Sequence, residues 1–224
     1  MVVKSVGQPD QSGDCAQSGY EIKPPRNSTK ALVTKSMRLG RAVVVKDFSR
    51  CSAVIKMLYG RPALRREARA YALLQGIPGI PECFGLAGRD RLVIEYISGR
   101  LLGNFKRGDV APVVFDRLDE IVQGAHARGV ALVDLHSSNI IISDNGDVFL
   151  IDFANALFAR DSRRPNMLVR LFMELDRHAA GRMRARYLLL TSPVSAGLFG
   201  VLYRTGRGLK TASGRIKKLF RSES

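Results

Sequence analysis

Cysteine is scarce in this sequence, and its N-terminal region has no long hydrophobic run. The three cysteines, at positions 15, 51 and 83, lie far apart and form no C-x-x-C pair, so neither a disulfide framework nor a zinc knuckle is expected. The first thirty residues are mostly polar or glycine and proline, and they lack the apolar core of a signal peptide. We therefore expect a protein of the reducing cytoplasm, with a flexible arm over residues 1–27.

Acidic residues are also in short supply. The 224 residues include 36 Lys+Arg and 20 Asp+Glu, which gives a formal net charge of +16. A hydrophobic content of 46% and a charged content of 25% are globular values, and they exclude wholesale disorder and a multispanning membrane protein. Fifteen Lys/Arg and four Asp/Glu lie in residues 160–224, so the C-terminal third carries most of the surplus. Such a region attracts the phosphates of anionic lipid or nucleic acid.

The periodicity of apolar residues divides the chain into strands and helices. Short β-branched or alternating stretches predict strands at residues 31–34, 41–48 and 91–97. Apolar residues at helical spacing predict helices at residues 63–75, 113–127 and 161–189. The last helix has an expected apolar face of Leu168, Leu171, Phe172 and Leu175.

A β-hairpin is the clearest local prediction. Two apolar runs, residues 140–143 and 148–151, flank a turn that contains Asn-Gly. Because the strands run antiparallel, Asn139 and Asp152 should meet at the same end of the hairpin. Oxygen ligands of this kind suit Mg²⁺. Asp134 lies one short loop upstream, where it could orient a hydroxyl group or accept its proton.

Two motifs around this hairpin carry a resemblance. The run Leu-Val-Asp-Leu-His-Ser-Ser-Asn at residues 132–139 resembles the catalytic loop of protein kinases and their small-molecule relatives, and Ile-Asp-Phe-Ala at residues 151–154 resembles their metal-binding Asp-Phe-Gly. The Asp-to-Asn spacing and the hairpin between the motifs also match, so the sequence is similar to the protein-kinase-like superfamily over about residues 43–155.

The resemblance implies an α+β, two-lobed protein-kinase-like fold. A small N-terminal β-sheet lobe with one main helix, followed by the hinge, would occupy residues 28–97. A reduced, mostly helical C-terminal lobe would occupy residues 98–190. Residues 191–224 would form a basic tail that can lie at a membrane interface.

The same resemblance requires a lysine on a strand of the N-terminal lobe and a glutamate on its helix. Lys46, after Val-Val-Val, and Glu67, in the predicted helix, fit that order. Lys56 is a rival, because Ala-Val-Ile-Lys at residues 53–56 is closer by letter to the kinase motif. We favour Lys46, since only eleven residues separate Lys56 from Glu67.

The chemistry implied is phosphoryl transfer from ATP with Mg²⁺. Lys46 would hold the α- and β-phosphates while Glu67 fixes it. Asn139 and Asp152 would hold Mg²⁺, and Asp134 would orient the acceptor hydroxyl. The adenine would meet main-chain groups of Glu95 and Ile97, with Ile94 behind it.

Departures from the protein-kinase pattern narrow the choice of phosphate acceptor. No glycine-rich loop is present, and only Gly40 separates the first two predicted strands, so a shorter turn would have to cover the phosphates. Val133 replaces the arginine that pairs with a phosphorylated activation loop. His136, which the resemblance places beside the nucleotide, gives the Asp-Leu-His of small-molecule kinases. Only 72 residues follow Asp152, as in lipopolysaccharide-core (Kdo/heptose) kinases and RIO-type atypical Ser/Thr kinases.

Residues 187–203 carry no charge and are flanked by basic residues. They are short for a membrane span, and they fit either an interfacial segment or a last helix. We therefore expect a cytoplasmic kinase, peripheral on the inner membrane face, that phosphorylates a lipopolysaccharide-core or other lipid-linked sugar. A RIO-like Ser/Thr protein kinase with a surface for nucleic acid, and a nucleotide-binding pseudokinase scaffold, remain as alternatives.

Overall fold

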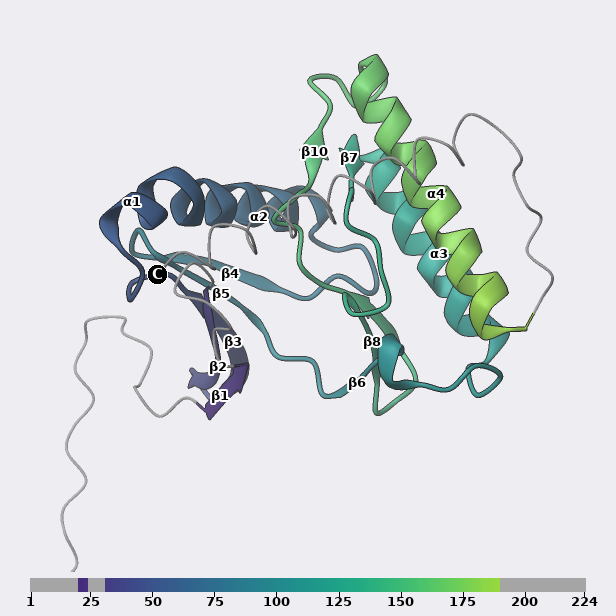
Figure 1. Cartoon of the computed structure of the whole chain (residues 1–224), viewed down its shortest axis with the longest axis horizontal. Coiled ribbons are helices and arrows are strands. Elements are labelled where there is room, and N and C mark those ends of the chain that lie inside the picture. Colours follow the sequence, from purple (N-terminus) through teal and green to yellow (C-terminus); the bar gives the residue numbers. More distant parts are fainter. Residues whose placement is uncertain (1–19, 24–30, 190–224) are drawn as a thin grey trace, which may run out of the picture. The chain divides into compact units, whose positions relative to one another are not determined.

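The N-terminal part of the chain is built on an antiparallel sheet of five strands (Figure 1). The structure is a computed structural model that describes residues 20–23 and 31–189. The strand order in the sheet is β1-β2-β3-β5-β4. The strands are β1 (Tyr20–Lys23), β2 (Leu32–Arg38), β3 (Arg41–Asp47), β4 (Cys83–Ala87) and β5 (Arg91–Glu95).

One continuous helical segment follows β3. It consists of α1 (Ala53–Ile55), the π-helical turn η1 (Lys56–Gly60) and α2 (Arg61–Leu74). Helix α2 lies along β4 and β5 (Figure 1). Its buried face includes Leu64, Tyr71 and Leu74, which join Leu92 and Ile94 of β5 in the main hydrophobic core. This packing places the middle of α2 beside the end of β3.

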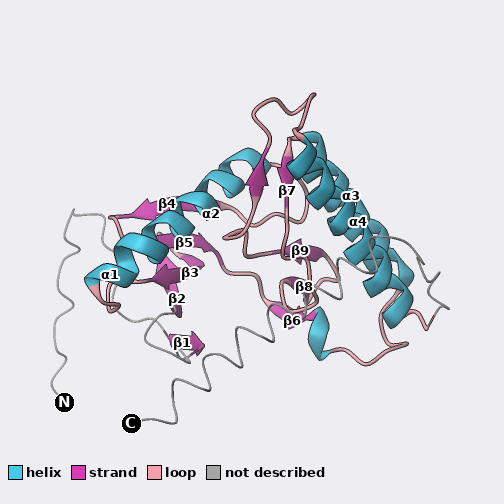
Figure 2. Cartoon of the chain, turned by 45° about the horizontal axis from the view of Figure 1, so that its top comes forward, coloured by secondary structure: helices cyan, strands magenta, loops and turns pink. Residues whose placement is uncertain are grey.

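The C-terminal part is organised around two helices that lie side by side, α3 (Pro112–Ala127) and α4 (Met167–Tyr187) (Figures 1 and 2). A three-stranded sheet packs near them, in the order β6-β8-β9. The shorter elements are β6 (Gly99–Leu101), η2 (Leu102–Asn104), β7 (Val130–Ala131), β8 (Ile140–Ser143), β9 (Val148–Leu150) and β10 (Leu157–Phe158).

The α+β architecture with a sheet-based first part and a helical second part is confirmed. The hairpin is confirmed in register, with Ile140 opposite Leu150 and Ile142 opposite Val148. Its turn is closed by main-chain hydrogen bonds from Gly146 to Ser143 and from Ser143 to Asp147. The predicted helices over residues 63–75 and 113–127 correspond to α2 and α3 within two residues at each end.

Three expectations need correction. The arm expected over residues 1–27 contains strand β1, which pairs with β2. The helix expected over residues 161–189 begins only at Met167, because the Asn166 side chain caps it by accepting from the Val169 N–H at 2.9 Å. Strand β4 forms at residues 83–87, where the sequence analysis predicts no strand, since Gly85 interrupts the pattern. The predicted boundary between lobes stays a prediction, and the predicted tail at residues 191–224 lies outside the described residues.

The turn at Gly40 also does not lie where a turn that covers the phosphates would have to lie. Leu39 and Gly40 join β2 to β3 with positive φ values of 48° and 77°, as a two-residue hairpin turn requires. Lys46 lies at the other end of β3, opposite Val33. A turn at this end of the strand therefore cannot cover phosphates held by Lys46, because the length of β3 separates the two.

Within residues 20–23 and 31–189, no helix is both long enough and apolar enough to cross a membrane.

Candidate functional site

Lys46, Glu67 and Asp152 form a cluster that joins the two parts of the chain. The Lys46 ammonium lies 2.6 Å from Glu67 Oε1 and 3.1 Å from Asp152 Oδ1. Lys46 comes from the end of β3 and Glu67 from the middle of α2, and Asp152 lies two residues after β9, the second strand of the hairpin. The side chain of Glu67 is only 2% exposed, whereas that of Asp152 is 44% exposed. The cluster thus has a buried anchor and an accessible carboxylate.

The charges of this cluster follow from its burial. Burial by itself lowers the pKa of Lys46, but the negative charges of Glu67 and Asp152 outweigh that effect, so the net pKa of Lys46 is raised. Burial raises the pKa of Glu67 more than the neighbouring ammonium lowers it. Lys46 therefore remains a cation at neutral pH, held in place and able to attract a phosphate oxygen.

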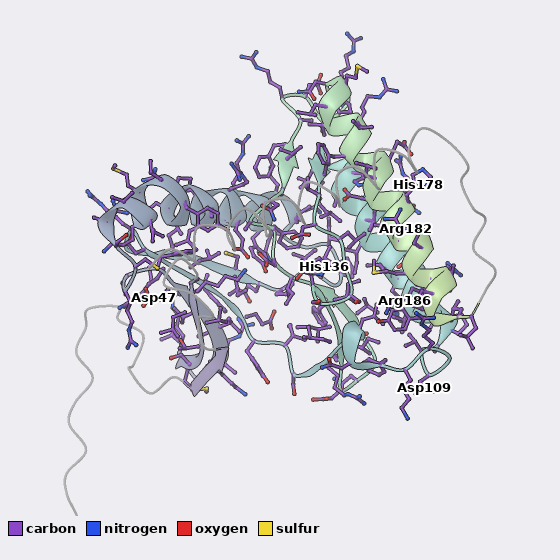
Figure 3. The ribbon with its side chains drawn as sticks, in the orientation of Figure 1. Asp47, Asp109, His136, His178, Arg182 and Arg186 are labelled. Carbon is purple, nitrogen blue, oxygen red and sulfur yellow. The ribbon has the colours of Figure 1, made fainter. Side chains whose placement is uncertain are left out.

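Residues 132–139 form the loop that presents Asp134. The Asp134 main-chain carbonyl accepts a hydrogen bond from the side-chain Nδ2 of Asn139 at 3.0 Å. This bond closes the loop across five residues. The Asp134 carboxylate accepts from Asn155 Nδ2 at 3.2 Å, and His136 Nε2 lies 3.5 Å from its other oxygen. Figure 3 labels His136 in the region between the N-terminal sheet and helices α3 and α4. The side chains of Asp134 and His136 are 31% and 46% exposed, so both can meet a substrate.

The hairpin brings Asn139 and Asp152 to one end, as the sequence predicted. The Ile151 N–H donates to the Asn139 carbonyl at 2.9 Å, which places the residue before Asp152 directly against Asn139. Asp152 has a φ of 69°, a left-handed conformation that Asp tolerates better than most residues. Asn139 is buried, and its amide nitrogen is committed to Asp134, so its carboxamide oxygen is left as a ligand.

These two oxygens fit a magnesium ion that also binds substrate phosphates. Mg²⁺ is usually held by one or two protein oxygens together with phosphate and water, and rarely by a full cage of side chains. The described residues contain no group of three or more His, Cys, Asp or Glu that could bind a metal by themselves. Asn139 and Asp152 are therefore the residues that would hold Mg²⁺, in the presence of a phosphate ligand.

The predicted adenine-binding segment lies at the end of β5. Ile94 is buried, with 3% of its surface exposed. The Glu95 N–H donates to the Glu82 carbonyl at 2.8 Å, and the Tyr96 N–H donates to the Ala42 carbonyl at 3.1 Å. Among the described residues, the Ile97 N–H has no such acceptor and can donate to a ligand. The Glu95 carboxylate is used within the protein, because it accepts from Arg41 and from the Glu82 N–H.

Lys56 does not occupy the position of a strand lysine. It begins the helical turn η1, and its ammonium donates to the Ser49 carbonyl at 3.2 Å. Residues 53–56 read as strand-like by letter, but the Ser52 side chain caps a helix there by accepting from the Ile55 N–H. The structure thus pairs Glu67 with Lys46 and leaves Lys56 outside the cluster.

Asp176 is a site residue that sequence reasoning missed. Its carboxylate accepts from the Leu132 N–H at 2.7 Å and from the Val133 N–H at 2.9 Å, and it lies 3.1 Å from His126 Nε2. The side chain is 2% exposed. Val133 has a φ of 68°, which is unfavourable for a β-branched residue, and the bonds to Asp176 hold this conformation. Asp176 therefore positions the loop that carries Asp134.

A signal for Asp176 existed in the sequence. The expected apolar face of α4 is wrong: Leu168 is 55% exposed, and Leu171, Phe172 and Leu175 are only partly buried. The buried face is displaced by one residue and includes an acid among apolar residues: Val169, Met173, Asp176, Ala180 and Met183. A carboxylate inside an apolar stripe needs buried donors, and the loop before β8 supplies them.

Comparisons with known proteins bear on the fold. No protein-family model matches the chain. The probable SapB synthase of Streptomyces coelicolor is 30% identical over an alignment 159 residues long, and the match covers 58% of this chain and 17% of that protein. The CBL-interacting serine/threonine-protein kinase 15 of Arabidopsis thaliana is 30% identical over an alignment 113 residues long, and the match covers 47% of this chain and 27% of that protein. The chain thus spans less than a third of the length of either curated relative.

Among solved structures, the Rio2 kinase from Chaetomium thermophilum, in an ADP/Mg²⁺-phosphoaspartate complex, matches with a TM-score of 0.61. The match has 15% sequence identity and covers 83% of this chain and 60% of that one. The chain therefore has a protein-kinase-like fold, which confirms the predicted fold class. At this identity, the similarity concerns the fold and leaves the activity to be argued from the site.

Proposed function

We propose that this protein is an ATP- and Mg²⁺-dependent phosphotransferase that acts on a hydroxyl acceptor. The observation that carries the proposal is the Lys46 ammonium, held 2.6 Å from Glu67 and 3.1 Å from Asp152, in a fold that also presents Asp134 and Asn139. These five residues are the minimum that phosphoryl transfer needs in this fold: a phosphate-binding cation with its anchor, two metal ligands and an acceptor-orienting carboxylate.

Each residue has a distinct role in this reaction. Lys46 binds phosphate oxygens of ATP, and Glu67 holds the ammonium in position. Mg²⁺, when bound through Asn139 and Asp152, neutralises charge on the phosphates. Asp134 orients the acceptor hydroxyl. As its oxygen bonds to the γ-phosphorus, the bond from that phosphorus to the β,γ-bridging oxygen breaks, ADP leaves, and the hydroxyl proton passes to Asp134.

For the acceptor we propose a lipid-linked sugar, such as a lipopolysaccharide-core sugar, at the inner face of the membrane. The Asp-Leu-His sequence at Asp134 and the basic residues after position 160 support this choice. Val133 stands where a protein kinase has an arginine, which also supports it, since control by an activation loop is then absent.

A RIO-like Ser/Thr protein kinase is the second candidate. The likeness to the Rio2 structure and the partial identity to a serine/threonine-protein kinase favour it. A pseudokinase that binds nucleotide without transfer is the third. It is disfavoured because Lys46, Glu67, Asp134, Asn139 and Asp152 are all present.

One labelling experiment distinguishes the three candidates. Purified protein is incubated with γ-³²P-ATP and Mg²⁺ together with either a bacterial membrane fraction or a soluble fraction. Label in a glycolipid supports the sugar kinase, whereas label on serine in proteins supports the second candidate and refutes the first. If neither fraction takes up label although the protein binds ATP, the pseudokinase remains.

A further inference from the structure

An exposed apolar surface lies on the short helical segment between β3 and α2. Val54, Met57, Leu58 and Tyr59 are 62%, 64%, 71% and 59% exposed. Among the described residues, these four make up a third of the twelve large apolar side chains that are exposed. Clustered exposed apolar side chains mark an interaction site more often than scattered ones do. We refer to these four residues as the apolar ridge.

The ridge is held firmly on the body of the protein. The Tyr59 ring packs edge-on against Phe48, with ring centroids 6.0 Å apart. Gly60 allows this close approach, because a Cβ atom at that position would lie 2.9 Å from the Phe48 ring. Ser52 caps the start of the segment. The exposed side chains therefore project from a fixed helical turn.

The surroundings of the ridge are strongly basic. Residues 48–69 contain six Lys/Arg and one acidic residue, Glu67, which is buried against Lys46. Four of the six basic side chains have partners in the protein: Lys56 with Ser49, Arg61 with Asp90, Arg66 with Ala154 and Arg69 with the Phe158 ring. Arg50 and Arg65 are exposed and have no ion-pair partner among the described residues.

We propose that the apolar ridge docks on an anionic lipid surface. Met57 and Leu58 would enter the boundary between headgroups and acyl chains, and Arg50 and Arg65 would bind lipid phosphates. This combination of apolar and basic side chains is what interfacial helices use to bind anionic bilayers. The sequence predicts an interfacial segment at residues 187–203, and the ridge consists of other residues.

Charge argues against a second copy of the chain as the occupant. Two ridges packed against each other would bring together two basic segments, residues 48–69 of each copy, and like charges oppose such a contact. A bilayer that contains acidic lipids supplies both the apolar interior and the opposite charge.

The position of the ridge suits docking with the candidate site left open. Figure 1 shows α1 at the end of α2 that is farther from α3 and α4. Residues 53–74 form one uninterrupted helical segment, so the ridge and Glu67 belong to the same segment. A surface bound at the ridge would therefore hold the N-terminal sheet and leave Asp134, whose loop is bonded to Asp176 of α4, free for the acceptor.

The first test measures binding of the full chain to vesicles by flotation. Phosphatidylcholine vesicles with and without phosphatidylglycerol are compared for wild type, for Met57→Ser with Leu58→Ser, and for Arg50→Glu with Arg65→Glu. Both double variants should weaken binding to the anionic vesicles by about tenfold or more, because each removes two lipid contacts. Met167→Ser with Leu168→Ser is the matched control, since these residues are 89% and 55% exposed beside other arginines. The control should change binding by less than about twofold.

The second test uses the absence of tryptophan from the chain. Leu58→Trp introduces a single indole on the ridge, and its emission should shift to the blue on addition of anionic vesicles, with quenching by brominated lipid. Met167→Trp should show neither effect.

Three results would overturn the proposal. One is unchanged vesicle binding by the Met57/Leu58 double variant, and another is an unshifted Leu58→Trp emission in vesicle-bound protein. The third is loss of self-association, measured by sedimentation, in the Met57/Leu58 variant with vesicle binding intact, which would assign the ridge to a second copy.

Discussion

The two halves of the candidate site are held in place by different means. In the N-terminal part, Lys46 and Glu67 position each other through a largely buried ion pair. In the C-terminal part, Asp134 and Asn139 are positioned by main-chain groups and by the buried Asp176 behind them. As a result, Glu67 is sealed from solvent, whereas the carboxylates of Asp134 and Asp152 remain accessible.

This difference separates the groups that hold a phosphate-binding charge in place from the carboxylates that react with the substrate. A charge that binds phosphate gains from a fixed partner in a poorly solvated place. A carboxylate that exchanges a proton with a substrate must be reached by it, so its geometry has to come from the backbone. Substitutions in the two halves should therefore fail in different ways.

The largest expected effect is on the reacting carboxylate. Asp134→Ala should lower the rate of phosphoryl transfer by about 10³-fold, within the range of general acid–base effects, while ATP binding and the unfolding temperature stay near wild type. Asp152→Ala should instead weaken Mg²⁺-dependent ATP binding. The measurements are transfer of label and equilibrium nucleotide binding. Wild-type turnover in both variants would show that the site is assigned wrongly.

Loss of the buried ion pair between Lys46 and Glu67 should lower the stability of the protein. Lys46→Met leaves the Glu67 carboxylate buried without its cation, which should lower the free energy of unfolding by about 3 kcal/mol at neutral pH. Lys56→Met is the matched control. Within the described residues, the Lys56 ammonium donates one hydrogen bond, to the Ser49 carbonyl, and forms no ion pair, so the substitution should change stability by less than about 0.5 kcal/mol. Denaturant unfolding measures both.

The same ion pair should make the stability deficit of Lys46→Met depend on pH. Burial already raises the pKa of Glu67, and removal of Lys46 removes the main group that lowers it. A carboxyl with a raised pKa in the folded state is most favourable to folding below its unfolded pKa, and that contribution is lost as the pH rises through the folded pKa. The stability deficit of Lys46→Met should therefore shrink as the pH falls from 7 towards 5. A deficit that is constant over this range would contradict the assignment.

Asp176 tests the backbone support of the reacting half. Asp176→Asn removes the charge and one acceptor oxygen, so it should cost about 2 kcal/mol of stability. It should also lower transfer activity more than ATP binding, because the Asp134 loop loses its anchor and Lys46 does not. Glu174→Gln, an exposed position on the same helix, serves as the control. Equal losses of activity and ATP binding would mean that Asp176 supports the whole fold and not this loop.

The smallest expected effect on stability concerns the partly exposed ion pair of Arg61 and Asp90, near the apolar ridge. The hydrogen bond from Arg61 lowers the pKa of the Asp90 carboxyl. Stability from this pair is present above the ordinary Asp pKa and is lost as the pH falls through the lowered value. Arg61→Ala should thus cause a small loss at neutral pH, below that of Asp176→Asn, and the loss should vanish in acid. Arg65→Ala, one turn along, should leave the pH profile of unfolding unchanged.

The sequence by itself determined the local features of the site. The Asn-Gly turn between two apolar runs specified the hairpin, and the antiparallel register then placed Asn139 and Asp152 at one end. The spacing of Asp134 and Asn139 matched that of the kinase catalytic loop. These features depend on residues close together in the chain, where turn geometry and hydrogen bonding are local.

The tertiary structure decided what depends on distant contacts. Lys46 and Lys56 both follow apolar residues. The spacing to Glu67 favours Lys46, and the packing of α2 on the sheet confirms that Lys46 meets Glu67 while Lys56 does not. Asp176 accepts hydrogen bonds from the Leu132 and Val133 N–H groups, more than forty positions away, so the apolar pattern of α4 could mark Asp176 as unusual but could not identify these partners. Apolar periodicity indicates that a helix has a buried face, but which residues are buried is set by the elements that pack against it. For the same reason, the sequence could not show that the residues of the apolar ridge are exposed, and the structure was needed to identify them.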